Sequence, residues 1–239
     1  MRRLLSRVRA AADDYNMICD GDRIAVGVSG GKDSLVLLKL MCELKRFYPA
    51  DFELVAVTLD MRFNGIDGDF SAIQALCDEY GIEYVVKRTH LAEIIFDVRK
   101  ETNPCSLCAR MRRGILHDSA KELGCNKIAL GHHLDDAAET FMMNLLNEGR
   151  IGCFAPVTYL SRKDITMIRP LIYARESEVS AAAERLGLPV IKSLCPEDEH
   201  TRREDAKTLL KTLSAEYGDV PEKIIGALQR GGIDRWEKQ

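Results

Sequence analysis

The sequence has no hydrophobic run long enough to cross a membrane. A membrane-spanning helix needs about 20 consecutive apolar residues, and no stretch of the 239 residues approaches that length. The basic start, Met1-Arg2-Arg3-Leu4-Leu5, also lacks the apolar core and the small-residue cleavage site of a secretory signal. We therefore expect a cytoplasmic protein that has no membrane partner.

The sequence also gives little support for a disulfide framework or for a recognised RNA-binding module. Its eight cysteines occur in a long chain without an export signal, and the net charge of -3 neither indicates nor excludes a nucleic-acid partner. Aromatic residues make up only 6% of the chain, so stacking platforms for bases are sparse. We expect Cys42 and Cys77 to be small core residues, and Cys19, Cys125 and Cys153 to be structural as well.

Neither internal repeats nor low-complexity linkers divide the chain. With 46% hydrophobic and 30% charged residues, a chain of this length suits one large α/β domain. Predicted strands alternate with predicted helices, which is typical of a doubly wound, mainly parallel sheet with helices on both faces. The five predicted strands are Ile24–Val28, Leu54–Leu59, Glu83–Lys87, Lys127–Leu130 and Ile165–Arg169. The predicted helices are Ser34–Lys45, Phe70–Tyr80, Ser106–Leu123, Asp135–Asn147 and Glu176–Leu186.

The pattern predicts three parts of the chain. Residues 1–22 form an N-terminal helical segment, residues 23–190 form the α/β domain, and residues 191–239 form a small helical appendage. Within the appendage Arg202–Tyr217 is amphipathic, and Pro221 suits the start of a second helix.

Neither of the two common nucleotide-binding motifs is present. A Walker loop needs a glycine where this chain has Val26 and a serine or threonine where it has Asp33, and no G-x-G-x-x-G occurs. What is present is Ser29-Gly30-Gly31-Lys32-Asp33-Ser34, between a predicted strand and a predicted helix. Glycines let the backbone approach a phosphate, and the helix N-terminus and Lys32 supply positive charge. The alternative is an ordinary Gly-Gly turn in which Asp33 or Ser34 caps the helix.

Two other polar segments follow predicted strands. Asp60 follows the second strand, and Gly131-His132-His133 follows the fourth. In open α/β sheets ligands bind beyond the carboxyl ends of the strands. These segments and the glycine-rich loop therefore predict one ligand site at this edge of the sheet.

A C-x-x-C motif, formed by Cys105 and Cys108, opens a predicted helix. A helix N-terminus and nearby arginines favour thiolates, but the motif alone suits a redox pair, half of a zinc site, part of an iron–sulfur site or coincidence. The best third ligand is Cys195, which Pro196 follows. Three cysteines suit a 4Fe–4S cluster with one open iron, and a Cys₃His zinc site that includes His200 is the rival. The spacing does not decide between them.

Six motifs, taken together and in this order, resemble those of the TtcA-like tRNA 2-thiocytidine synthases, which belong to the PP-loop N-type ATP pyrophosphatases. The resemblance extends from about Tyr15 to Lys211. The motifs are Tyr15-Asn16-Met17, Ser29–Ser34, Pro104–Cys108 with Arg112-Arg113-Gly114, Gly131–Asp136 with Glu139-Thr140, Ile168–Leu171 and Cys195-Pro196.

The resemblance implies an ATP-dependent tRNA sulfurtransferase with the PP-loop ATPase fold. In this family ATP and Mg²⁺ adenylate the C2 oxygen of a cytidine in the tRNA anticodon loop, and sulfur then replaces that oxygen as AMP leaves. AMP is a far better leaving group than a carbonyl oxygen, so one hard step is split into two easier ones. The implied sulfur donor is a cysteine desulfurase or free sulfide, and a homodimer is compatible with these expectations.

The resemblance also implies roles for individual residues. The loop residues Ser29, Gly30, Gly31, Lys32, Asp33 and Ser34 hold the pyrophosphate part of ATP, with Lys32 and Asp33 acting in catalysis. Cys105, Cys108 and Cys195 bind a 4Fe–4S cluster whose open iron carries sulfide.

Other roles follow from chemistry and position. Asp135 and Asp136 are expected to place Mg²⁺ or orient the base, although acidic residues at a helix start are often only capping groups. Asp60 is expected to contact the nucleotide, and a solvated strand-end aspartate is nearly as good an interpretation. Gly131 and His132 are expected to shape the ATP pocket. Arg112 is expected to contact a phosphate or the activated base, unless it simply faces solvent.

Basic residues suggest a surface for RNA phosphates, and scattered solvated arginines are an equally good interpretation. The residues concerned are Arg2, Arg3, Arg7, Arg9, Arg110, Arg112, Arg113, Arg202 and Arg203. Two other functions stay open at this point. One is a PP-loop ligase that adenylates another RNA base or a small molecule and uses zinc only for structure. The other is a non-catalytic, ATP-binding redox sensor.

Overall fold

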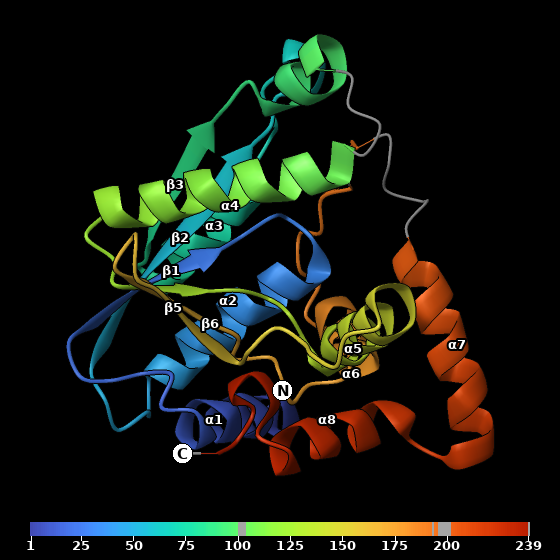
Figure 1. The fold of residues 1–239 in the computed structure, drawn as a ribbon. Coiled ribbons are helices and arrows are strands. Elements are labelled where there is room, and N and C mark those ends of the chain that lie inside the picture. Colours follow the sequence, from blue (N-terminus) through green and yellow to red (C-terminus); the bar gives the residue numbers. More distant parts are fainter. Residues whose placement is uncertain (100–103, 193, 196–201, 239) are drawn as a thin grey trace.

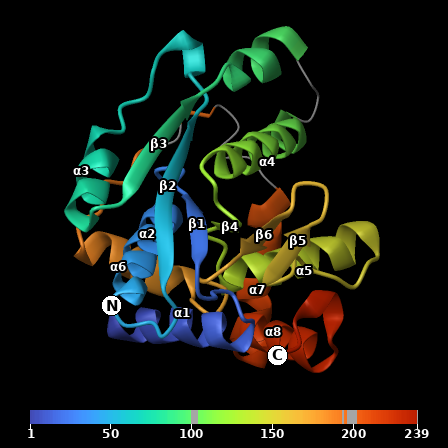
Figure 2. The same cartoon turned by 90° about the vertical axis from the view of Figure 1, so that its left-hand side faces the viewer.

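The computed structural model describes residues 1–99, 104–192, 194–195 and 202–238. Its centre is a six-stranded sheet with the strand order β3-β2-β1-β4-β6-β5 (Figure 2). All neighbouring strands run parallel except β5 and β6, which are antiparallel. The strands are β1 (Asp22–Gly27), β2 (Phe52–Asp60), β3 (Glu83–Arg88), β4 (Lys127–Ala129), β5 (Val157–Leu160) and β6 (Ile165–Ile168).

Helices cover both faces of the sheet, as the sequence predicts (Figure 1). Side chains alternate along β1, so that Ile24 and Val26 enter one apolar cluster and Ala25 enters the other. The smaller cluster lies under α4, which supplies Leu116 and Ala120. The larger cluster includes residues of the remaining α-helices. The helices are α1 (Arg2–Asp14), α2 (Lys32–Lys45), α3 (Ser71–Tyr80), α4 (Pro104–Glu122), α5 (Leu134–Glu148), α6 (Glu176–Arg185), α7 (Arg202–Tyr217) and α8 (Val220–Arg230).

The sheet has one strand more than the five that the sequence predicts. The additional strand, β5, forms a hairpin with β6 at the edge of the sheet, and Asp164 in the connecting turn adopts a φ of 48°. The apolar sequence pattern of β5 is weak, because the strand has only four residues and its Tyr159 is 54% exposed. Three short helices complete the fold: η1 (Phe63–Gly65), the π-helix η2 (Glu93–Arg99) and η3 (Ile233–Arg235).

The C-terminal segment packs against the first helix and the sheet domain. Trp236 is fully buried, and its indole N–H donates to the carbonyl of Phe154 over 3.0 Å. The Tyr15 hydroxyl donates to the Trp236 carbonyl over 3.1 Å. Both chain ends lie in the lower part of the molecule in these views, with the N-terminus at the start of α1 (Figures 1 and 2). Among the described residues, no helix combines the length and the apolar character that crossing a bilayer requires.

Candidate functional site

The loop between β1 and α2 has the backbone of an anion cradle. Gly30 has a φ of 86°, a conformation that side-chain-bearing residues rarely adopt. The Ser29 amide donates to Ser34 Oγ over 3.1 Å, and the Ser34 hydroxyl donates to the Gly31 carbonyl over 2.8 Å. Gly31 is the N-cap of α2 and brings no side chain to its first amides. These amides and the helix dipole therefore favour a negatively charged group at this loop.

Lys32 lies at the start of α2 and already contacts two carboxylates. Its Nζ is 3.0 Å from Asp33 Oδ1 and 3.2 Å from Glu176 Oε1. Burial alone would lower the pKa of Lys32, but the hydrogen bond and charge of Asp33, together with Glu176, raise it. Lys32 is thus a firmly protonated ammonium group that contacts two carboxylates.

Glu176, at the start of α6, connects the loop to the C-terminal helix α7. Its Oε2 is 2.7 Å from Nζ of Lys207, and its backbone amide donates to Asp135 Oδ2 over 2.6 Å. Although burial raises the pKa of Glu176, its hydrogen bonds with Lys207 and Lys32 bring that pKa below its ordinary value. Glu176 is therefore a carboxylate shared between two lysines.

The segment after β4 packs directly on the glycine-rich loop. A Cβ atom on Gly131 would lie 3.1 Å from the carbonyl carbon of Asp33 and 3.2 Å from the Ser34 nitrogen. His133 caps α5: its Nδ1 accepts from the Asp136 amide over 3.3 Å, and Asp136 Oδ2 accepts from the His133 amide over 2.9 Å. The glycine-rich loop and the segment after β4 thus meet at the same edge of the sheet.

The two aspartates of this segment both have protein partners. Asp135 Oδ1 is 3.1 Å from a guanidinium nitrogen of Arg175, and Asp136 Oδ1 accepts from Arg203 over 2.6 Å. Glu139, one turn further along α5, is 3.7 Å from Arg203, and burial raises its pKa to about 7. The aspartates thus lie at the expected edge of the sheet, held there by arginines of other elements.

His132 lies deep in the protein beside the site. Burial, and then the charge of Arg169, lower its pKa to about 4, so the imidazole is neutral near pH 7. Its ring centroid is 5.1 Å from that of Phe154, and the Arg169 guanidinium lies 4.8 Å from the same Phe154 ring. The buried Nδ1 of His132 has no hydrogen-bond partner among the described residues. This position suits a side chain that shapes a pocket.

Asp60 uses its carboxylate to order the loop that follows β2. Its Oδ1 accepts from the Arg62 amide, and its Oδ2 accepts from the Gly68 amide, both over 3.0 Å. The side chain is buried, so the solvated-aspartate interpretation is not what the structure has. Its observed contacts are with the protein backbone.

The C-x-x-C motif lies at the beginning of α4, with Cys105 exposed and Cys108 half-buried. Burial raises the pKa of Cys108, and the nearby Cys195 and Cys105 raise it further, whereas Arg112 lowers it. Cys108 therefore lies within electrostatic range of Cys105, three residues away, and of Cys195, which is far from it in the sequence. Among the described residues, no three His, Cys, Asp or Glu side chains are close enough together to hold a metal ion.

The segment that leads to Cys195 is fixed to the glycine-rich loop. The Ile191 amide donates to the Gly30 carbonyl over 2.9 Å, and a Cβ atom on Gly30 would lie only 3.1 Å from the Ile191 Cβ. In Figure 1 this orange segment leaves α6, passes the loop before α2 and rises toward the start of α4. Four residues span at most about 14 Å, so Cys195 lies within that distance of Ile191.

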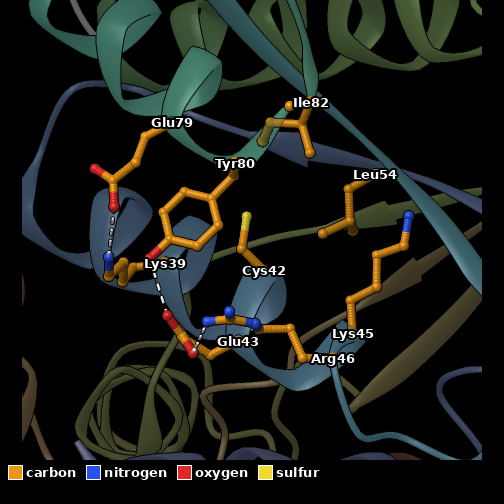
Figure 3. A pocket seen from close by; sticks show the side chains of 10 residues that line it. Lys39, Cys42, Glu43, Lys45, Arg46, Leu54, Glu79, Tyr80 and Ile82 are labelled. Carbon is orange, nitrogen blue, oxygen red and sulfur yellow. Dashed lines mark hydrogen bonds and ion pairs between the residues drawn. The ribbon is translucent and has the colours of Figure 1, made fainter.

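A cavity of 620 Å³ lies on another part of the molecule (Figure 3). It is bounded by the second half of α2 and by the amino ends of β2 and β3, the sheet edge opposite the loop. Lys39 lies 4.3 Å from the centroid of the Tyr80 ring and 3.6 Å from Glu79, and Arg46 pairs with Glu43. The cavity is therefore separate from the glycine-rich loop, which lies at the opposite ends of the strands.

Sequence reasoning did not identify Glu176, Lys207 and Glu139 as site residues, and it placed Arg203 on an RNA-binding surface. Glu139 belongs to a motif used for the resemblance, which is the one signal that pointed to it. Arg203 and Lys207 lie on α7, and nothing in their local sequence indicates which distant carboxylates they contact. His200 and Pro196 lie outside the described residues.

Comparisons with known proteins agree with this geometry. Residues 5–205 match the PP-loop domain family. A protein of Syntrophotalea carbinolica named tRNA-cytidine(32) 2-sulfurtransferase is 41% identical over 95% of this chain and 88% of its own length. One of the same name from Pelobacter propionicus is 42% identical over 95% of this chain and 85% of its own length.

A solved structure is also similar over most of the chain. It is that of the U34-tRNA thiolase NcsA from Methanococcus maripaludis, determined with its [4Fe-4S] cluster. The TM-score is 0.78 and the identity 29%, with 96% of this chain and 77% of the other covered.

Proposed function

Because this chain belongs to the tRNA-cytidine(32) 2-sulfurtransferase family, we propose that it uses ATP to replace the C2 oxygen of a tRNA cytidine by sulfur. The observation that carries the proposal is the contact between Gly30 and Ile191, because it joins the phosphate-binding loop to the segment that ends at Cys195. Adenylation and sulfur transfer act on the same carbon–oxygen bond, so both sites must open onto one base.

The loop residues have the chemistry for the first step. The C2 oxygen of the base attacks the α-phosphorus of ATP, the bond to the bridging oxygen breaks, and pyrophosphate leaves with its electron pair. Lys32 and the free amides at the start of α2 face the developing negative charge of the pyrophosphate. Asp135 and Asp136, which lie at the same edge of the sheet, are the carboxylates that we assign to Mg²⁺, since the cation prefers oxygen ligands.

Sulfide completes the reaction. It attacks C2 of the adenylated base, the bond from C2 to the bridging oxygen breaks, and AMP leaves carrying that oxygen. A 4Fe–4S cluster held by three cysteines would supply the sulfide for this step. Cys105, Cys108 and Cys195 fit such a group in donor chemistry, and Cys108 is within electrostatic range of the other two.

Further features of the proposal concern the molecule as a whole. The sulfide comes from a cysteine desulfurase or from free sulfide. Residues 23–190 form the PP-loop domain, preceded by a helical segment at 1–22 and followed by an appendage at 191–239 that carries Cys195. The enzyme acts in the cytoplasm, where its tRNA substrate is present.

Two variants of anaerobically purified protein test the proposal. Lys32→Ala is expected to abolish tRNA-dependent AMP release while iron and sulfide contents stay as in the wild type. Cys195→Ala is expected to lose the cluster and thiolation while ATP still binds. Lys211→Ala, on the exposed face of α7, is the control and should behave as wild type. Thiolated tRNA from Cys195→Ala, or colourless wild-type protein that contains zinc, would contradict the proposal.

A further inference from the structure

The arginines that the sequence offers for RNA binding differ in how far their charge is compensated. On α1, Arg3 lies 3.0 Å from Glu178, Arg7 lies 3.2 Å from the same carboxyl group, and Arg9 lies 3.5 Å from Asp13. On α7, Arg203 contacts Asp136. These cations already have carboxylate partners, so a phosphate would have to displace a carboxylate to bind them.

The charged side chains in the second half of α4 also have partners of opposite charge. Lys163 contacts Asp118 of this helix over 2.5 Å, and Lys87 contacts Glu122 over 2.6 Å. Lys121, from the helix itself, is 3.5 Å from Asp164. This end of α4 therefore presents balanced charge.

The first half of α4 is different. Arg110, Arg112 and Arg113 are all exposed, and within the described part of the chain none of them forms an ion pair. No acidic residue occurs in α4 before Asp118. Lys192, on the segment between the glycine-rich loop and Cys195, is also exposed and has no carboxylate partner among the described residues. We call Arg110, Arg112, Arg113 and Lys192 the α4 basic patch.

The α4 basic patch flanks the cysteines. Arg110 and Arg113 lie about 8 to 12 Å along the helix axis from Cys105, given a rise of about 1.5 Å per residue, and being three residues apart they share one face. Arg112 interacts with the Cys108 thiol. Figures 1 and 2 show α4 in the upper part of the molecule and α1 at the bottom, so the compensated arginines of α1 lie far from this place.

We propose that the α4 basic patch is the surface on which the RNA backbone docks, and that Arg3, Arg7 and Arg9 of α1 take no part. The inference rests on the proposed function, because a base that receives sulfur must reach the cysteines while its neighbouring phosphates remain outside. Exposed guanidinium groups without carboxylate partners suit those phosphates, and counterion release from the RNA drives the contact.

The test compares two double variants that remove the same charge. Arg110→Gln/Arg113→Gln removes two cations from the patch, and Arg3→Gln/Arg9→Gln removes two compensated cations from α1. Binding of unmodified tRNA is measured by fluorescence anisotropy between about 50 and 200 mM salt, a range over which phosphate contacts change affinity strongly.

The α4 variant should bind tRNA roughly tenfold or more weakly. Its slope of log affinity against log salt should be shallower by about 1.4 to 1.8, since each phosphate contact contributes about 0.7 to 0.9. The α1 variant should match the wild type in its affinity for tRNA and in its salt slope. Equal losses in the two variants, or an unchanged slope in the α4 variant, would overturn the proposal.

Thiolation separates this inference from the function on which it rests. The α4 variant should show a raised KM for tRNA and a kcat close to that of the wild type at saturating tRNA and low salt. Wild-type protein that does not thiolate tRNA contradicts the proposed function itself. Wild-type protein that does, together with an α4 variant of unchanged KM, contradicts only the docking surface.

Discussion

At the scale of single residues, Glu176 occupies the ammonium group of Lys32 in the glycine-rich loop. Glu176 lies between Lys32 and Lys207, at 3.2 Å from one and 2.7 Å from the other. In the proposed mechanism ATP draws Lys32 away from this carboxylate, and Glu176 then keeps its contact with Lys207. Lys207 is therefore a positioning residue that acts on Lys32 through Glu176.

Lys207→Met should raise the KM for ATP roughly threefold to tenfold and leave kcat close to wild type. The reason is that Glu176 would then contact Lys32 alone, and partly exposed ion pairs contribute about 1 kcal/mol. Steady-state kinetics with varied ATP measure this, and Lys211→Met on the same helix is the matched control. In a Glu176→Gln background the Lys207 substitution should have no further effect. An equal loss in both backgrounds would mean that Lys207 acts on ATP directly.

A second prediction at this scale concerns Glu139, whose pKa burial raises from 4.5 to about 7. Between these values the unfolded chain has released the proton while the folded protein retains it, so the group's contribution to stability falls as pH rises. The free energy of unfolding of wild type relative to Glu139→Gln should therefore decrease from about pH 5 to pH 7 and then stay level. Urea denaturation at several pH values measures it, and a difference independent of pH would show that the carboxyl titrates normally.

At the scale of elements, the close approach of the β4–α5 segment to α2 makes Gly131 a sensitive position. An alanine there would bring a Cβ within 3.2 Å of backbone atoms at Asp33 and Ser34, so the first turn of α2 must shift. Gly131→Ala should weaken ATP binding at least tenfold, measured by calorimetry. Gly114→Ala is the matched control, because its Cβ would meet nothing within 4 Å. That change should stabilise the interior of α4 by about 1 kcal/mol and leave ATP affinity unchanged.

Which elements the sequence predicts depends on how local their signals are. β1, β2, β3, β4 and β6 have apolar runs bounded by turn residues, and the structure contains all five. The hairpin strand β5 lacks such a run, since its pairing with β6 depends on a tertiary edge that no local pattern encodes. The meeting of the glycine-rich loop with the β4–α5 segment follows from parallel strand order. The contacts of Arg203 with Asp136 and of Lys207 with Glu176 cannot be predicted in this way. They depend on where α7 packs, and the packing of the whole chain determines that.

At the scale of the whole molecule, the C-terminal segment fastens the first helix to the sheet domain. Trp236 is fully buried and hydrogen-bonded to Phe154, next to the His132 ring. Trp236→Ala should lower the free energy of unfolding by about 3 to 5 kcal/mol, which is typical of removing a buried aromatic side chain. Tyr217→Ala, where the side chain is 57% exposed, should change it by less than about 0.5 kcal/mol. Chemical denaturation measures both, and similar effects of the two substitutions would contradict the anchoring role of Trp236.

The fold joins the glycine-rich loop to the cysteine-bearing segment through the Ile191–Gly30 hydrogen bond and the packing of Ile191 against Gly30. The most direct measurement of that coupling is a single-turnover assay with anaerobic protein, ATP, sulfide and unmodified tRNA, in which AMP and 2-thiocytidine are quantified together by mass spectrometry. We predict one AMP per thiolated cytidine in the wild type and neither product in Lys32→Ala. AMP that forms in the absence of tRNA, or sulfur that enters tRNA in the absence of ATP, would show that the two sites do not serve one reaction.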